Sequence, residues 1–267
     1  MMAIQQLFPK PGSLIGMIHL GALPGTAFQT QSLDDVLAQA AREAQQLAEL
    51  GFDGLIVENM GDRPYLRREV GPEIVAAMTA ACVAVRAAAP NLPLGVQVLA
   101  GANHEALAVA HSSGAQFVRV EGFVFSSVAD EGLLEEASAG SLLRYRKQIG
   151  AQGIAILADI KKKHSSHAIT EDLSLAETAK AAEFCGADGL IVTGASTGEV
   201  TSLADLEETA RATSLPVMVG SGVTPEQVPE LSRWAAGLIV GSYLKHAGQW
   251  QNELDLARCA ELVRAAK

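Results

Sequence analysis

The sequence predicts a (β/α)8 barrel that forms one domain over residues 1–267. Eight short runs rich in β-branched residues alternate with helical segments, which is the element order of this fold. The length lies in the normal range for such a barrel, which closes around one core. Hydrophobic residues make up 49% of the chain and aromatic residues only 4%. The core must therefore consist of Ala, Val, Leu and Ile, as alternating strands and helices favour.

The eight predicted strands recur at intervals that leave room for one helix between neighbours. Helix starts carry their own signals, because Ser32 can cap the run that follows it and Thr224 precedes a proline suited to a first helical turn. From first to eighth, the strands are predicted at residues 14–20, 55–59, 94–99, 117–121, 154–161, 190–193, 217–220 and 238–241.

The connections differ in length between the two ends of the predicted barrel. Helix-to-strand turns are tight, whereas four strand-to-helix connections are long, at residues 21–31, 60–71, 122–140 and 162–174. Barrel enzymes keep their chemistry at the C-terminal ends of the strands, so the site is expected there. The stretch 123–140 is long enough for a lid, in a helical or a loop state.

Charge and hydropathy exclude several classes of partner. Thirty acidic and twenty basic residues give a net charge of −10, which disfavours nucleic acid or an anionic membrane. The apolar runs are too short for an integral membrane segment and the N-terminus has no basic signal head, so we expect a soluble cytoplasmic protein. Cys82, Cys185 and Cys259 are widely spaced and predict inert thiols. The sequence leaves open whether helices that bear Trp234 or Trp250 form the contacts of a homo-oligomer.

The fifth strand ends in the densest group of ionisable residues. Asp159 and Lys161 lie two residues apart in an extended strand and so point the same way, towards the barrel mouth. A carboxylate beside an ammonium predicts proton transfer, and a plain buried ion pair is the alternative. Lys163 is a candidate for binding an anionic substrate and His164 for acid–base chemistry. The alternative for both is that they belong to a solvated, charged loop.

Polar residues also end the first and second strands. His19 interrupts an apolar run and is a candidate catalytic residue, with a core histidine as the alternative. Glu58 is a candidate catalytic group and Asn59 a candidate substrate ligand, against loop capping. No cofactor is certain. A divalent metal remains an alternative, with His19, Asp159, His164 and His167 as ligands, although no tight motif requires it.

Three further strands supply candidate substrate-binding residues. Arg119 and Glu121 share one face of the fourth strand, and Gln97 lies near the same level of the third. Arg119 could clamp an anion or pair with Glu121, and the sequence does not decide between them. Thr193 ends the sixth strand and belongs to the same set.

Glycine-rich turns follow the seventh and eighth strands. Ser221 and Gly222 come after the seventh, and Gly241 and Ser242 after the eighth. Glycines let backbone amides approach phosphate oxygens, serines add hydroxyls, and a helix beginning at Thr224 would point its positive end inward. These positions predict a phosphate-binding barrel whose partner is a small anionic, phosphorylated metabolite. Ordinary glycine turns are the alternative.

Several spaced motifs resemble one known family. They are 16–25 (GMIHLGALPG), 53–62 (DGLIVENMGD), 117–122 (FVRVEG), 129–132 (ADEG), 158–164 (ADIKKKH) and 240–245 (VGSYLK). The chain resembles the BtpA/SgcQ family nearly end to end. The resemblance implies a TIM barrel related to phosphate-binding enzymes, with members linked to photosystem I biogenesis or to sugar utilisation. The sequence departs from the family pattern at 98–103 (VLAGAN).

The residues and the resemblance together favour an enzyme. We expect an isomerase, lyase or glycosyl hydrolase acting on a phosphorylated sugar or nucleoside-like metabolite. The alternative is a non-catalytic assembly factor of the photosystem I biogenesis type, peripheral to membranes, which fold analogy does not exclude. No amphipathic basic helix supports membrane attachment.

Overall fold

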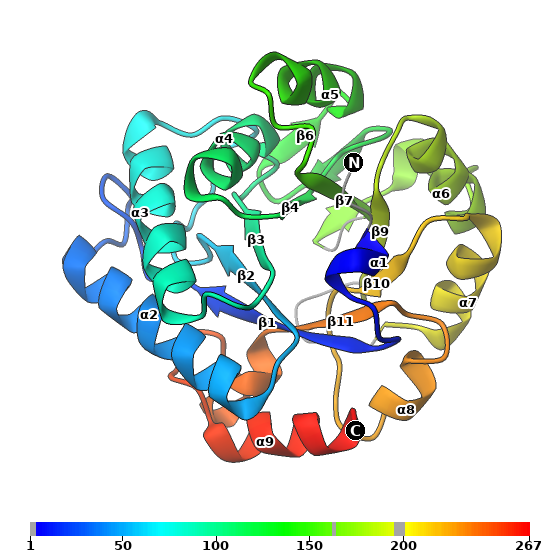
Figure 1. Cartoon of the computed structure of the whole chain (residues 1–267). Coiled ribbons are helices and arrows are strands. Elements are labelled where there is room, and N and C mark those ends of the chain that lie inside the picture. The colour runs from blue at the N-terminus through cyan, green and yellow to red at the C-terminus, as the bar shows by residue number, and fades with distance from the viewer. Residues whose placement is uncertain (1–3, 162–163, 195–200) are drawn as a thin grey trace.

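The structure is a computed structural model that describes residues 4–161, 164–194 and 201–267. Eight parallel strands close into a barrel in the order β1-β2-β3-β4-β7-β9-β10-β11, and β11 pairs with β1 (Figure 1). All eight predicted strands are confirmed to within one residue at the N-terminal end and two at the C-terminal end. Their bounds are β1 Ser13–His19, β2 Gly54–Glu58, β3 Leu94–Gln97, β4 Phe117–Val120, β7 Ala155–Ile160, β9 Gly189–Val192, β10 Val217–Val219 and β11 Gly237–Val240.

Helices surround the barrel and cover the outward face of each strand (Figure 1). Ser32 caps the first of the long ones as predicted, and its hydroxyl accepts the amide of Asp35. The helices are α2 Leu33–Leu50, α3 Pro72–Ala88, α4 Asn103–Ser113, α5 Ala139–Gln148, α6 Leu175–Phe184, α7 Leu203–Ala212, α8 Val228–Leu231 and α9 Leu256–Ala265. None of the helices in the described residues is long and apolar enough to cross a membrane.

Two apolar layers follow from the alternation of each strand. Leu14 and Ile18 face the helices in the larger core cluster, whereas Ile15 and Met17 point into the barrel and belong to a second cluster. The short helix α1 (Ile4–Leu7) closes the N-terminal opening, because Ile4 and Phe8 pack into this inner cluster. The opposite, C-terminal end is therefore the end that can receive a ligand.

The long connection between β4 and α5 forms a small sheet of its own. Strands β5 (Ser127–Ala129) and β6 (Gly132–Leu134) make an antiparallel hairpin, and β8 (Ser165–Ser166) pairs with β5. The predicted lid stretch 123–140 thus contains a β-hairpin and the first residues of α5. Sequence periodicity cannot detect strands this short.

The segment after β11 is held to helix α2 by a buried ion pair. It contains the short 3-10 helices η2 (Ser242–Leu244) and η3 (His246–Gly248). Between them, the Lys245 ammonium reaches both carboxylate oxygens of Glu43 in α2, at 2.6 and 2.7 Å, and both side chains are buried. Removing one partner of a buried ion pair leaves an uncompensated buried charge and strongly destabilises the folded protein. This contact therefore fixes the segment to α2.

Glu43→Gln is expected to destabilise the protein by about 3–5 kcal/mol, because it leaves the Lys245 ammonium buried without its counter-charge. Glu207→Gln is the matched control, since Glu207 pairs with Arg211 on the exposed side of α7 and such pairs contribute about 0–1 kcal/mol. Urea unfolding followed by circular dichroism measures both. Equal effects of the two substitutions would contradict the anchoring role of the Lys245–Glu43 pair.

The three thiols are expected to differ in reactivity. Burial raises the pKa of Cys82 to about 12 and that of Cys259 to about 11, so both stay protonated, whereas Cys185 is half-buried. Iodoacetamide at pH 8 is expected to label one thiol per native chain and three after unfolding, counted by mass spectrometry. Labelling of two or more thiols in the native protein would contradict this.

Candidate active site

The inward-facing residues change from apolar to polar or glycine at the C-terminal end of the barrel. Below this level they are apolar, as in Ile15, Met17 and Ile56. Two residues further along each strand, the same alternation brings a polar side chain or a glycine inward. This top layer consists of His19, Glu58, Gln97, Arg119, Asp159, Thr193, Gly220 and Gly241.

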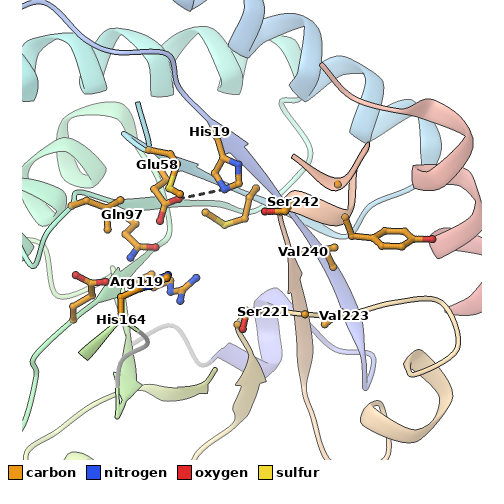
Figure 2. A pocket seen from close by; sticks show the side chains of 18 of the residues that line it. His19, Glu58, Gln97, Arg119, His164, Ser221, Val223, Val240 and Ser242 are labelled. Carbon is orange, nitrogen blue, oxygen red and sulfur yellow. Dashed lines mark ion pairs between the residues drawn. The ribbon is translucent and has the colours of Figure 1, made fainter. Parts of the chain in front are cut away.

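A cavity of about 450 Å³ opens above the top layer. One side is lined by acidic and imidazole groups from the ends of β1 to β4 and from the hairpin tip, and the other by the turns after β10 and β11. Figure 2 shows His19, Glu58, Gln97, Arg119, Ser221 and Ser242 around the cavity. The cavity size suits a small metabolite.

His19 and Glu58 form the ion pair at one side of the cavity. The His19 Nε2 atom lies 3.4 Å from the Glu58 Oε2 atom, and both side chains are over 90% buried (Figure 2). A Cβ atom at Gly241 would lie 2.8 Å from Cε1 of His19, so only glycine leaves room for the ring. Trp250 meets the imidazole edge to face, with ring centroids 6.2 Å apart. The imidazole is therefore held between a carboxylate, a glycine and an indole.

Arg119 is a buried cation at the cavity floor. Its Nε and Nη2 atoms donate to the two oxygens of Asp159, at 2.8 and 3.1 Å. Burial, the largest influence, lowers the pKa of Arg119, but the attraction and hydrogen bonds of Asp159, with Glu58 and Glu121, together raise it. Arg119 also lines the cavity, where its guanidinium charge is paired with Asp159. Its ion-pair partner is Asp159 and not Glu121.

Asp159 and Lys161 both border one small recess, but their side chains bind different partners. The Asp159 carboxylate is held by Arg119, whereas the Lys161 ammonium donates to the carbonyl of Leu173 at 2.6 Å. The strand ends at Ile160 and Lys161 adopts a left-handed φ of 50°, which takes its side chain out of the alternation. Lys161 lines a second, small recess together with Asp159 and His167.

The remaining predicted ligands divide between the cavity and its surroundings. Gln97 is buried, lines the cavity, and its Oε1 atom has no hydrogen-bond partner among the described residues. Glu121 and His164 also line the cavity. Asn59 instead donates to Asp62 at 2.8 Å and accepts the amide of Leu99 at 2.7 Å, so it supports the loops behind the site. Lys163 lies outside the described residues.

The predicted metal ligands divide between two cavities. His19 and His164 line the main cavity, whereas Asp159, which binds Arg119, and His167 line the smaller recess. Within residues 4–161, 164–194 and 201–267, no group of three or more His, Cys, Asp or Glu side chains is placed to hold a metal ion.

The two glycine-rich turns form the other side of the cavity. The cradle, as we call Gly220, Ser221, Gly222, Gly241 and Ser242, lines the cavity as a group. Ser221 is fixed by the amide of Gly194, which donates to its hydroxyl at 3.0 Å. A Cβ atom at Gly220 would lie 2.6 Å from Cγ2 of Thr193, so Thr193 supports the cradle from behind rather than lining the cavity.

The helix predicted at Thr224 begins later and is shorter than expected. The amide of Thr224 donates to the side chain of Gln227 at 3.2 Å, and α8 starts only at Val228. This helix has four residues, so it does not direct a substantial dipole at the cradle.

Sequence reasoning did not assign several residues of the cavity wall to the site, among them Tyr65, Asp130, Glu131 and Arg258. Tyr65 has a pKa raised by burial and then by Glu58, so its phenol stays protonated. Asp130 and Glu131 form the tip of the β5–β6 hairpin, and Arg258 comes from α9. The pairing of short strands brings Asp130 and Glu131 to the site and the docking of the last helix brings Arg258, although the 129–132 motif is recognised in the sequence without a role at the site.

Trp234 and Trp250 lie in turns and not on the helical faces expected for subunit contacts. Trp250 packs against His19, and the guanidinium of Arg63 lies 5.3 Å from its ring centroid. The guanidinium carbon of Arg211 lies 5.2 Å from the centroid of the Trp234 ring.

The chain matches the model of the BtpA family over residues 10–267. An uncharacterised mitochondrial protein of Caenorhabditis elegans is 46% identical over 94% of this chain and 91% of its own length. A Synechocystis protein named Photosystem I biogenesis protein BtpA is 37% identical over 99% of this chain and 91% of its own.

Solved structures share the fold at low sequence identity. The (S)-3-O-geranylgeranylglyceryl phosphate synthase of Thermoplasma acidophilum, solved with sn-glycerol-1-phosphate, has a TM-score of 0.65 at 17% identity and covers 100% of this chain and 99% of its own. A 3-hexulose-6-phosphate synthase has a TM-score of 0.59 at 18% identity, covering 96% of this chain and 100% of its own. At these identities the likeness concerns the fold.

Asp159→Asn is expected to destabilise the protein by about 3–5 kcal/mol, because Arg119 is left as a buried cation without its bidentate partner. Lys161→Met is the control and removes one hydrogen bond to Leu173, with an expected cost of about 1 kcal/mol. Urea unfolding measures both. A greater loss of stability for the Lys161 variant would contradict the assignment of Asp159 to Arg119.

Proposed function

The chain belongs to the BtpA family, and we propose that it is an enzyme that binds a phosphorylated sugar or nucleoside-like metabolite and moves a proton on it. The proposal rests on one observation: a single cavity is lined both by a phosphate-type cradle and by ionisable side chains. The cradle offers neutral donors, and the neighbouring His19, Glu58 and Arg119 offer acid–base and electrostatic groups.

The cradle would hold the phosphate group. Its glycines leave the backbone amides open to close approach, and Ser221 and Ser242 add hydroxyls. The turns after the seventh and eighth strands are where barrels of this kind bind phosphate. Two fold neighbours are named for phosphorylated compounds, which supports this assignment by analogy.

The other end of the metabolite would carry the reacting carbon. The His19–Glu58 pair would take a proton from a carbon next to a carbonyl, and the electron pair would move to the carbonyl oxygen. Arg119, fixed by Asp159, would stabilise the resulting enediolate oxyanion. Where the deprotonated carbon carries a hydroxyl, the hydroxyl proton would pass to the oxyanion oxygen, and the pair would return its proton to the former carbonyl carbon. Gln97 supplies an acceptor for a substrate hydroxyl.

Ligand binding is tested by thermal unfolding with inorganic phosphate, ribose 5-phosphate and sn-glycerol 1-phosphate. Binding to the native state stabilises it, by about 2.7 kcal/mol at a ligand concentration 100 times the dissociation constant. Ser242→Ala is expected to reduce the shift, whereas Ser112→Ala, on the exposed side of α4, is expected to leave it unchanged. No shift with any phosphorylated compound would contradict the proposal.

Proton transfer is tested in the same samples by exchange of carbon-bound hydrogen in D2O, followed by NMR with aldose and ketose phosphates. His19→Gln and Glu58→Gln are expected to slow exchange by about 10²–10⁴-fold while keeping the phosphate-induced shift. His111→Gln is the matched control, because His111 lies exposed on α4. Unchanged exchange in the His19 and Glu58 variants would exclude their catalytic role.

An assembly role is the second candidate. It is favoured by the name of the Synechocystis relative and by Val128 and Leu133, which are cross-strand neighbours of the hairpin and are 42% and 45% exposed. A scaffold does not require the ionisable cavity groups. Retained partner assembly in a His19→Gln, Glu58→Gln double variant that shows no ligand response would favour this role.

A further inference from the structure

The cradle lacks a charge of its own. Its five residues are neutral, and the helical segments that follow it, α8 with four residues and η2 with three, are too short for a strong helix dipole. A phosphate monoester carries about −1.5 to −2 charges at neutral pH. Arg119 is already neutralised by Asp159. A second source of positive charge is therefore needed to bind the dianion.

Arg258 lies beside the cradle. Its Nε atom donates to the carbonyl of Tyr243 at 2.8 Å, and its guanidinium carbon lies 4.2 Å from the centroid of the Tyr243 ring. Tyr243 directly follows Ser242 in the chain, and both residues line the cavity together with Arg258. The guanidinium is thus anchored one residue away from the cradle.

The rest of the guanidinium group borders the cavity. A Cβ atom at Gly248 would lie 3.8 Å from Nη2 of Arg258, and Gly248 is itself part of the cavity wall. Within the described part of the chain, Arg258 makes no ion pair with a carboxylate, unlike Arg119 and Arg146. Stacking on Tyr243, rather than a counter-charge, holds it in place.

We propose that Arg258 is the charged donor of the cradle and that it makes the site select a dianionic phosphate monoester over an uncharged sugar. The inference rests on the proposed function, because it names the charge state that the cradle recognises. A guanidinium suits this task, since its planar fork donates two parallel hydrogen bonds to phosphate oxygens. Its position on a stacked ring limits the rotamer freedom lost on binding.

The test compares Arg258→Met with Arg264→Met, which makes the same charge change on an exposed position of the same helix. Isothermal titration with inorganic phosphate and with ribose 5-phosphate is expected to show about 10- to 100-fold weaker binding for Arg258→Met. Arg264→Met is expected to bind like the wild type. Arg258→Lys keeps a charge without the fork and is expected to fall between wild type and Arg258→Met.

The pH dependence separates charge recognition from damage to the fold. Inorganic phosphate and phosphate monoesters lose their second proton near pH 6–7, so wild-type affinity is expected to rise between pH 5 and pH 8. Arg258→Met is expected to show a shallower rise. Thermal unfolding without ligand establishes that each variant is folded, and Arg258→Gln replaces the Met variant if that one is not.

Two results would overturn the inference and are distinguishable. If Arg258→Met and Arg258→Gln bind phosphate as tightly as the wild type while Ser242→Ala binds it more weakly, the cradle stands and Arg258 has no part in it. If the wild type binds neither inorganic phosphate nor ribose 5-phosphate, the proposed function falls together with this inference.

Discussion

Closure of the eight-stranded barrel is the constraint on which the site depends. Because side chains alternate along each strand, closure forces every second residue of all eight strands into one interior. Lower positions fill it with apolar side chains such as Ile15 and Met17. At the next level His19, Glu58 and Arg119 point the same way, so the geometry that packs the core also assembles the polar floor of the cavity.

The electrostatics of that floor follow from burial. The buried guanidinium of Arg119 is stabilised by two hydrogen bonds to the Asp159 carboxylate. The acidic side of the cavity, with Glu58 and Glu121 near Arg119, therefore has a fixed cation at its centre. The five cradle residues themselves carry hydroxyls and amides but no charge. This asymmetry gives a metabolite with one anionic and one polar end a single orientation.

The sequence predicts strand positions and inward-facing residues well, because both depend on local alternation and on glycine turns. It predicts the residues beyond the strand ends poorly. Lys161 departs from the alternation through a left-handed φ that no local signal marks, and the side chain of Gln227 delays the helix expected at Thr224. Asp130 and Arg258 reach the cavity only through tertiary contacts of a short hairpin and of the last helix.

The cavity also lies across the seam where the barrel closes. The first strand pairs with the last, from Ser13 opposite Gly237 to Gly16 opposite Val240, and His19 packs against Gly241 just above this pairing. A ligand held by Ser242 and reaching His19 would bridge the two strands that are farthest apart in the sequence. The ion pair between Lys245 and Glu43 fixes the same region from outside. Ligand binding and barrel closure are therefore linked, since each stabilises the same arrangement of first and last strands.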